Sequence, residues 1–179
     1  MTNITIDIAD SAVNAQLQAL SRKLGNVEPA LTVAAEGLLE RTKRRFETST
    51  APDGTQWKEN APATLGILAR SMGKSYKRKN GLPNSEGRAK LGNKKPLYQS
   101  GDLKRQITAK ASGNSIVMQA TMIYAAIQHF GGQAGRGKKV KIPSRPFMPL
   151  NPSTNDLYPQ EREAIERAIS DYFDWDSPA

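Results

Sequence analysis

The chain has 179 residues, 37% of them hydrophobic, and a formal net charge of +9; this length suits one domain, expected to span residues 1–179. It contains no cysteine, which excludes a disulfide framework, a thiolate nucleophile and cysteine-bound zinc. No apolar run approaches the roughly 20 residues that cross a bilayer, and the N-terminus lacks a signal pattern, so we expect synthesis in the cytoplasm and no membrane contact.

Three elements are predicted in the first 48 residues. Isoleucine alternates with polar residues over 4–8, which indicates a half-buried strand. Apolar residues at helical spacing predict a helix over 11–24, ended by Gly25 and Asn26. Pro29, which suits a first-turn position, begins a second helix that continues to about residue 48 and has a basic end. We interpret both apolar stripes as core packing.

A strongly basic section follows at residues 68–97, where glycine, serine, asparagine and proline are frequent. Glu86 is the only acid in this section. Its nine basic residues are Arg70, Lys74, Lys77, Arg78, Lys79, Arg88, Lys90, Lys94 and Lys95. This composition predicts a mobile basic arm, inserted into the fold as a long loop. The sequence is compatible both with a merely solvated arm and with one that faces a partner protein or DNA.

Regular structure is predicted again after residue 97. Alternation around Ile107 and Met118, on either side of a turn at 111–114, predicts a β-hairpin. Apolar residues from Leu157 to Tyr172 fit one face of a final helix, whose polar residues are mainly acidic. Together the elements predict an α+β fold, in which a small antiparallel sheet packs with two N-terminal helices and a C-terminal helix.

The stretch after the hairpin has a helix, a stop and a second basic segment. Residues 124–130 have the apolar spacing of a short helix, and Gly131 with Gly132 can adopt the left-handed backbone that ends it. A basic, glycine-rich loop is predicted over 131–141. Its charged residues are Arg136, Lys138, Lys139 and Lys141.

A short extended run and a kink complete this stretch. Residues 140–142 fit an edge strand, because Pro143 and Pro146 fix φ, lack backbone donors and prevent an inner strand from continuing. We expect Phe147 to be buried beside the resulting kink.

The motifs that carry chemistry are incomplete. Residues 132–139 nearly spell a phosphate-binding P-loop, but Lys139 stands where the motif needs a hydroxyl for magnesium. His129 is the only histidine, and neither an acidic cluster nor a serine elbow accompanies it. We therefore expect a structural role for His129, and we predict no enzyme activity, no metal site and no cofactor.

Four stretches occur in a set order: residues 45–57, Ser-Gly-Asp-Leu at 100–103, Tyr-Ala-Ala-Ile-Gln-His-Phe-Gly-Gly at 124–132 and Ile-Pro-Ser-Arg-Pro-Phe-Met at 142–148. In this order they resemble the tailed-phage virion morphogenesis family, which holds Mu-like tail-completion proteins. The residues to which the resemblance assigns a structural role are Trp57, Ser100, Gly101, Leu103, Tyr124, Ala125, His129, Gly131, Pro143, Arg145, Pro146 and Phe147.

The resemblance implies a structural protein of a tailed phage or prophage that acts in tail completion or head–tail joining, as a ring-forming connector at the neck. It implies a homo-oligomer, with a hexameric ring as in the family, and other tail or neck proteins as partners. The protein would reside in the host cytoplasm during assembly and then in the virion.

Charge suggests how such a ring would form, and also an alternative function. The basic loops and the acidic last helix are complementary, so neighbouring copies would meet head-to-tail. The basic arm and loop would order against a partner ring or face DNA in the lumen. The alternative is a non-specific DNA-binding protein that uses its basic arms on the phosphate backbone.

Overall fold

The computed structural model of the chain describes residues 4–8, 11–24 and 27–175. Its centre is a three-stranded antiparallel sheet with β3 in the middle, made of β1 (Ile4–Ile8), β2 (Ile107–Ser112) and β3 (Ser115–Ala120). β2 and β3 form the hairpin that the alternation predicted, and β1 pairs with the other edge of β3. The predicted α+β class is confirmed.

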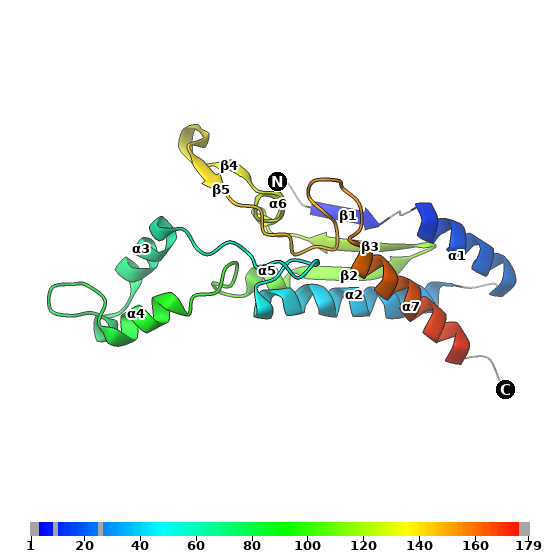
Figure 1. The fold of residues 1–179 in the computed structure, drawn as a ribbon, viewed down its shortest axis with the longest axis horizontal. Coiled ribbons are helices and arrows are strands. Elements are labelled where there is room, and N and C mark those ends of the chain that lie inside the picture. Colours follow the sequence, from blue (N-terminus) through cyan, green and yellow to red (C-terminus); the bar gives the residue numbers. More distant parts are fainter. Residues whose placement is uncertain (1–3, 9–10, 25–26, 176–179) are drawn as a thin grey trace.

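Three helices complete the body of the molecule: α1 (Ser11–Leu24), α2 (Glu28–Thr48) and α7 (Pro159–Trp175). α2 packs against β2, β3 and α7 (Figure 1). Its buried positions recur at helical spacing from Ala30 to Phe46, so that one stripe faces the sheet and the last helix. The helix begins with Pro29 in its first turn and is ended by Ser49, whose φ is 57°. Leu157, expected within the last helix, instead lies before it and pairs with Leu150 in an isolated bridge.

Aromatic rings contact one another in the core. Phe46 contacts Trp57 edge-on and Phe147 at a tilt, with ring centroids 5.4 Å apart in each pair. His129 meets Phe147 edge-on at 5.2 Å. Phe147 is fully buried, as expected for the residue beside the proline kink. The rings therefore join the end of α2, the segment after it and the 142–148 stretch into one core.

A buried ion pair ties α7 to α2. Arg45 and Glu161 form a salt bridge, and the Arg45 guanidinium also donates to the Phe147 carbonyl at 2.6 Å. Arg41 Nε donates to the same carboxylate at 3.1 Å. Burial lowers the pKa of Arg45, and the charge of Glu161 opposes that shift. The acidic residues of the last helix were expected to complement the basic loops of a neighbouring copy, but Glu161, one of these acids, lies in the interior.

Two segments project from the same end of the body (Figure 1). The helical projection, residues 61–93, contains α3 (Pro62–Ser71), a 3-10 turn η1 (Lys74–Tyr76) and α4 (Ser85–Gly92). The β projection, residues 131–142, contains β4 (Gly132–Ala134), η2 (Arg136–Lys138) and β5 (Val140–Ile142). α7 runs toward the opposite end of the molecule.

The helical projection differs from the loop predicted over 68–97. The Asn84 side chain caps α4 by accepting from the Gly87 amide at 2.8 Å. A Cβ on Gly87 would lie 2.4 Å from the Tyr76 carbonyl oxygen, so the absence of a side chain lets α4 pack on the turn before it. These local contacts form a helical hairpin despite the polar composition. Mobility of the segment stays a prediction.

The β projection also differs from its prediction. The strand expected at 140–142 is present, but it pairs with β4 in a separate two-stranded hairpin and not with an edge of the main sheet. The predicted short helix is α6 (Ala125–Phe130), ended by Gly131 with φ 75°. A four-residue helix, α5 (Asp102–Arg105), precedes β2 and has no counterpart among the predicted elements. Within the described part of the chain, no helix is long and apolar enough to span a membrane.

Candidate functional site

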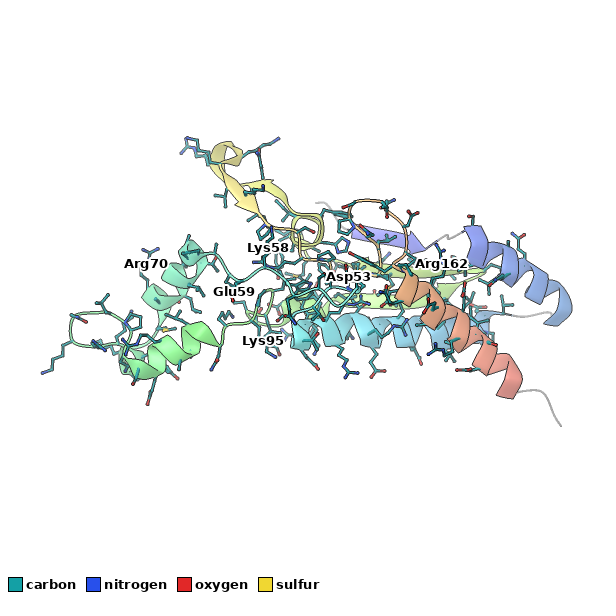
Figure 2. The ribbon with its side chains drawn as sticks, viewed as in Figure 1. Asp53, Lys58, Glu59, Arg70, Lys95 and Arg162 are labelled. Atoms are coloured by element: carbon teal, nitrogen blue, oxygen red, sulfur yellow. The ribbon has the colours of Figure 1, made fainter. Side chains whose placement is uncertain are left out.

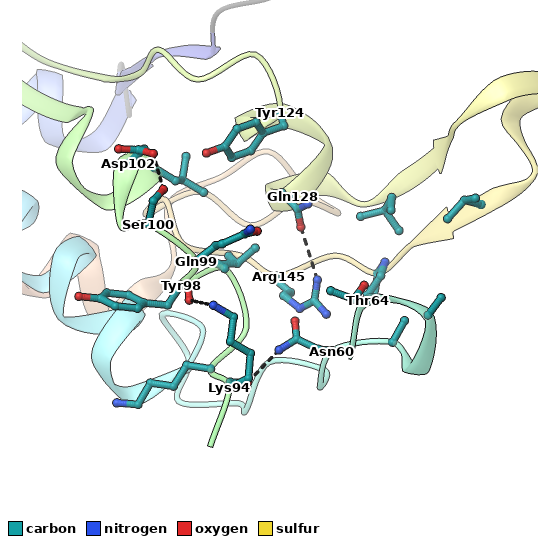
Figure 3. Close-up of a pocket in the computed structure, with 18 of the residues that line it drawn as sticks. Asn60, Thr64, Lys94, Tyr98, Gln99, Ser100, Asp102, Tyr124, Gln128 and Arg145 are labelled. Atoms are coloured by element: carbon teal, nitrogen blue, oxygen red, sulfur yellow. Dashed lines mark hydrogen bonds between the residues drawn. The ribbon is translucent and has the colours of Figure 1, made fainter. Parts of the chain in front are cut away.

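A cleft of about 380 Å³ lies where the two projections leave the body (Figure 3). Its walls come from the start of the helical projection, the segment 94–103, α6 and the strand β5 with the residues after it. Asn60 joins two of these walls, because its side-chain amide donates to the Lys94 carbonyl at 2.8 Å. The volume is in the range of pockets that hold a small ligand or a few side chains.

Arg145 lies at the base of the cleft and holds its walls together. Its Nε donates to the Lys58 carbonyl and its Nη2 to the Glu59 carbonyl, both at 2.8 Å, and its Nη1 approaches Gln128 Oε1 at 3.4 Å. Its backbone amide donates to the Gln128 carbonyl at 2.9 Å. Figure 2 shows Lys58 and Glu59 at the base of the helical projection. The 142–148 stretch is therefore hydrogen-bonded both to α6 and to the base of the helical projection.

The Arg145 guanidinium has no carboxylate partner among the described residues. The residue is only 6% exposed, and burial lowers its pKa from the ordinary value. A guanidinium carries five N–H donors, of which three are used here. Donor capacity for an anionic ligand remains at the base of the cleft.

The rim of the cleft is basic and partly aromatic. Its cations are Lys94, Lys95 and Lys141, and Asp102 is the only acid among the lining residues. Asp102 is already paired with Arg105 and hydrogen-bonded to Ser100. The apolar part of the rim is formed by Tyr98, Tyr124 and Val140, which are 44%, 37% and 54% exposed. The cleft therefore presents excess positive charge beside exposed apolar surface.

His129 lies in the core beneath the cleft. Its Nδ1 accepts from the backbone amides of Phe147 and Met148 at 3.2 and 3.4 Å. Burial lowers its pKa to about 4; a hydrogen bond with the Leu150 backbone opposes this shift, and the charge of Arg45 adds to it. The imidazole is therefore neutral near pH 7 and orients the chain after the kink. The structural role expected for His129 stays a prediction.

The other motif residues stabilise the same region. Trp57 Nε1 donates to the Pro146 carbonyl at 2.9 Å. Ser144 donates to the His129 carbonyl at 2.7 Å. A Cβ on Gly131 would lie 2.7 Å from the Ser144 backbone nitrogen, so the turn after α6 can pack against the kink only because this residue has no side chain.

The structure divides the predicted site residues into three groups. The cleft lining includes Lys94, Lys95, Ser100, Gly101, Leu103, Tyr124, Lys141, Pro143 and Arg145. Beneath or beside it lie Trp57, Ala125, His129, Gly131, Pro146 and Phe147. Outside it, on the projections, are Arg70, Lys74, Lys77, Arg78, Lys79, Arg88, Lys90, Arg136, Lys138 and Lys139. The motif stretches thus meet at one place.

Some predicted basic residues are engaged within the helical projection. Lys77 Nζ donates to the Arg70 carbonyl at 2.8 Å, and Lys90 Nζ lies 4.2 Å from the centre of the Tyr76 ring. Arg70 lies on α3 away from the body (Figure 2).

Sequence reasoning did not single out several residues that build the site. Asn60, Tyr98 and Gln128 line the cleft. Gln128 belongs to the 124–132 motif, so its place in that motif was an available signal. The position of Asn60 depends on a contact with Lys94 across the base of an insertion, which no local pattern reveals. Among the described residues, no group of three or more His, Cys, Asp or Glu side chains could hold a metal ion.

Comparison with known proteins gives a consistent picture. A protein similar to this chain is the Mu-like prophage FluMu G protein 2 of Haemophilus influenzae, 41% identical over 78 residues, which is 44% of this chain and 51% of that protein. The chain therefore matches about half the length of this curated relative. No solved structure matches. The model of the phage virion morphogenesis family matches residues 8–174, almost the whole chain. The chain belongs to the phage virion morphogenesis family.

Proposed function

We propose that the protein is a non-enzymatic connector that forms a ring during tail completion or head–tail joining of a tailed phage or prophage. The observation that carries the proposal is the convergence of the motif stretches on a basic cleft at one end of an elongated body. Family membership supports a structural part in the virion. In this proposal the protein assembles in the host cytoplasm and then occupies the tail–neck region, with no cofactor.

The arrangement of the two ends supports self-assembly. The cleft and both projections lie at one end, and α7 extends toward the other. A contact between unlike ends of identical copies is heterologous, and it closes into a ring when the rotation between copies permits. The hexameric ring implied by the family resemblance, and contacts with other tail or neck proteins, are part of this proposal.

Analytical ultracentrifugation and negative-stain electron microscopy test the proposal. The purified protein is measured alone and after mixing with tails or heads that lack it. We expect rings, either free or attached to one end of the particle. A protein that stays monomeric at every concentration, and binds neither particle, would contradict the connector function.

Contact with the DNA backbone is a second candidate function. The helical projection carries seven basic residues and one acid, and the β projection carries four basic residues and no acid. Most of these cations are exposed. Exposed lysine and arginine neutralise phosphates and release counterions without reading sequence, which suits a surface that faces DNA inside a ring.

A salt titration of DNA binding tests this second function. Arg78→Ala, Lys79→Ala and Arg88→Ala are combined in one variant, with Lys43→Ala, Arg44→Ala and Lys110→Ala on the body as the matched control. If the projection contacts phosphates, the first variant should reduce the slope of log affinity against log salt by about 3. Equal slopes in the two variants would exclude the projection as a DNA contact.

A further inference from the structure

A short segment near the end of the sequence has the chemistry that the cleft lacks. Residues 173–176 read Phe-Asp-Trp-Asp, so two acids alternate with two aromatic residues, and no basic residue occurs after Arg167. Tyr172, just before this segment, is half-buried against the core. A ligand with this sequence would bring carboxylates and large apolar rings together.

The cleft is complementary to such a ligand. Arg145 holds unused donors at the base, and arginine binds carboxylates with directed, often paired hydrogen bonds. Lys141 adds positive charge to the lining, which also includes the partly exposed rings of Tyr98 and Tyr124. Aromatic rings that pack on tyrosine add to the area buried. The carboxylates of the segment are therefore complementary to Arg145 and Lys141, and its aromatic rings are complementary to Tyr98 and Tyr124.

The direction of α7 points to a second copy as the source of this segment. α7 is anchored to α2 by the buried Arg45–Glu161 pair at its first turn, and it runs away from the projections (Figure 1).

We propose that the cleft around Arg145 binds residues 173–176 of a second copy, so that the acidic–aromatic segment of one subunit docks between the two projections of the next. This inference rests on the proposed self-assembly and assigns its contact. Duplex DNA is the less suitable occupant, because the Arg145 donors lie at the base of a cleft and the protruding cations of the projections would meet phosphates first.

Peptide binding to the intact protein tests the docking contact. A fluorescent peptide of residues 170–179 is titrated with the full chain, and its anisotropy is measured. Saturable binding is expected, and substitution of both Asp174 and Asp176 by asparagine in the peptide should weaken it about tenfold or more. Absence of saturable binding, or an unchanged affinity of the substituted peptide, would overturn the proposal.

Protein variants locate the binding surface. Lys141→Glu and Tyr98→Ala change the rim without removing the hydrogen bonds that Arg145 makes to the body. Each should lower the affinity for the peptide about tenfold. Lys138→Glu makes the same charge change outside the cleft and should alter affinity less than twofold. Equal effects of Lys141→Glu and Lys138→Glu would show a non-specific charge effect and contradict the assignment. A short DNA duplex that displaces the peptide completely, with affinity that Tyr98→Ala also weakens, would assign the cleft to nucleic acid instead.

The outcome is distinguishable from failure of the connector function. Rings formed equally well by the Lys141→Glu protein would overturn the docking contact and leave the connector function intact. Peptide binding with the expected variant pattern, in a protein that forms no ring and binds no particle, would support the docking contact and contradict the connector function.

Discussion

Different interactions stabilise the body of this protein and its two projections. The body has a continuous buried core, in which Phe46, Trp57, His129 and Phe147 make mutual ring contacts. In the helical projection only Met72 and Gly87 are buried, and in the β projection no residue is. The projections depend on local hydrogen bonds and turn geometry, so stability is concentrated in the body, while the projections supply surface for contacts.

Removing a core ring should have the largest effect in this comparison. Phe147→Ala deletes a fully buried side chain and should lower the free energy of unfolding by about 3–5 kcal/mol, measured by chemical denaturation. Phe130→Ala is the matched control, since Phe130 is 41% exposed, and it should cost far less. A small effect at Phe147 would mean that the core does not extend to the kink.

The buried histidine should make the stability of the body depend on pH. His129 has a pKa of about 4 in the folded protein, below its ordinary value of 6.5. The unfolded chain therefore binds a proton below pH 6.5 that the folded protein binds only near pH 4. The contribution is fully present above pH 6.5 and falls by about 3 kcal/mol as pH drops through this window.

Comparison with His129→Asn isolates this pH effect, because the asparagine Oδ1 can accept a hydrogen bond but does not titrate. Denaturation at several pH values between 4 and 7 should show a shallower loss of stability for the variant than for the native protein. Parallel curves would mean that His129 does not contribute to the pH dependence.

Removing the helical projection should affect stability much less than its size suggests. Replacement of residues 62–92 by a short glycine–serine linker should change the free energy of unfolding of the body by about 1 kcal/mol or less, because the segment contributes little to the core. The same variant should lose assembly. A large drop in thermal stability would show that the body depends on the projection.

Single charges on the projections should have the smallest effect on stability. Arg78→Ala removes an exposed cation and should shift the free energy of unfolding by no more than about 0.5 kcal/mol. Thermal denaturation at low and high salt checks this expectation. A larger change would mean that this charge is part of the structure and not only of a contact surface.

Much of the body could be predicted from sequence because its elements are periodic. The alternation around the 111–114 turn and the long apolar stripe of α2 each reflect burial of one face. The alternation over 4–8 coincides with β1. The projections were harder to predict. α4 has few apolar residues, and its start depends on the Asn84 cap and on the close approach at Gly87. Asparagine and glycine are also frequent in loops, so these residues alone do not indicate a helix.

The candidate site was predictable only in part. The motif stretches singled out Arg145 and Tyr124, and the basic loop included Lys141. The distance of these residues in sequence from Asn60 and Tyr98 concealed the shared cleft. The same holds for Arg45 and Glu161, whose separation of 116 residues hid a buried ion pair. Such pairings depend on which elements pack together, and local patterns carry no information about that.

The sequence by itself determined the elements of the body, the family resemblance and the excess of positive charge, since each follows from residue type and spacing. Only the tertiary structure decided that the basic section folds into helices and that one acid of the last helix is internal. It also decided that Arg145 lies in a cleft with no acidic partner among the residues that the structure describes. The physical reason is that burial and hydrogen bonding at these positions arise between segments far apart in the chain. The burial and the partners of a charged residue therefore depend more on its neighbours in space than on its neighbours in sequence.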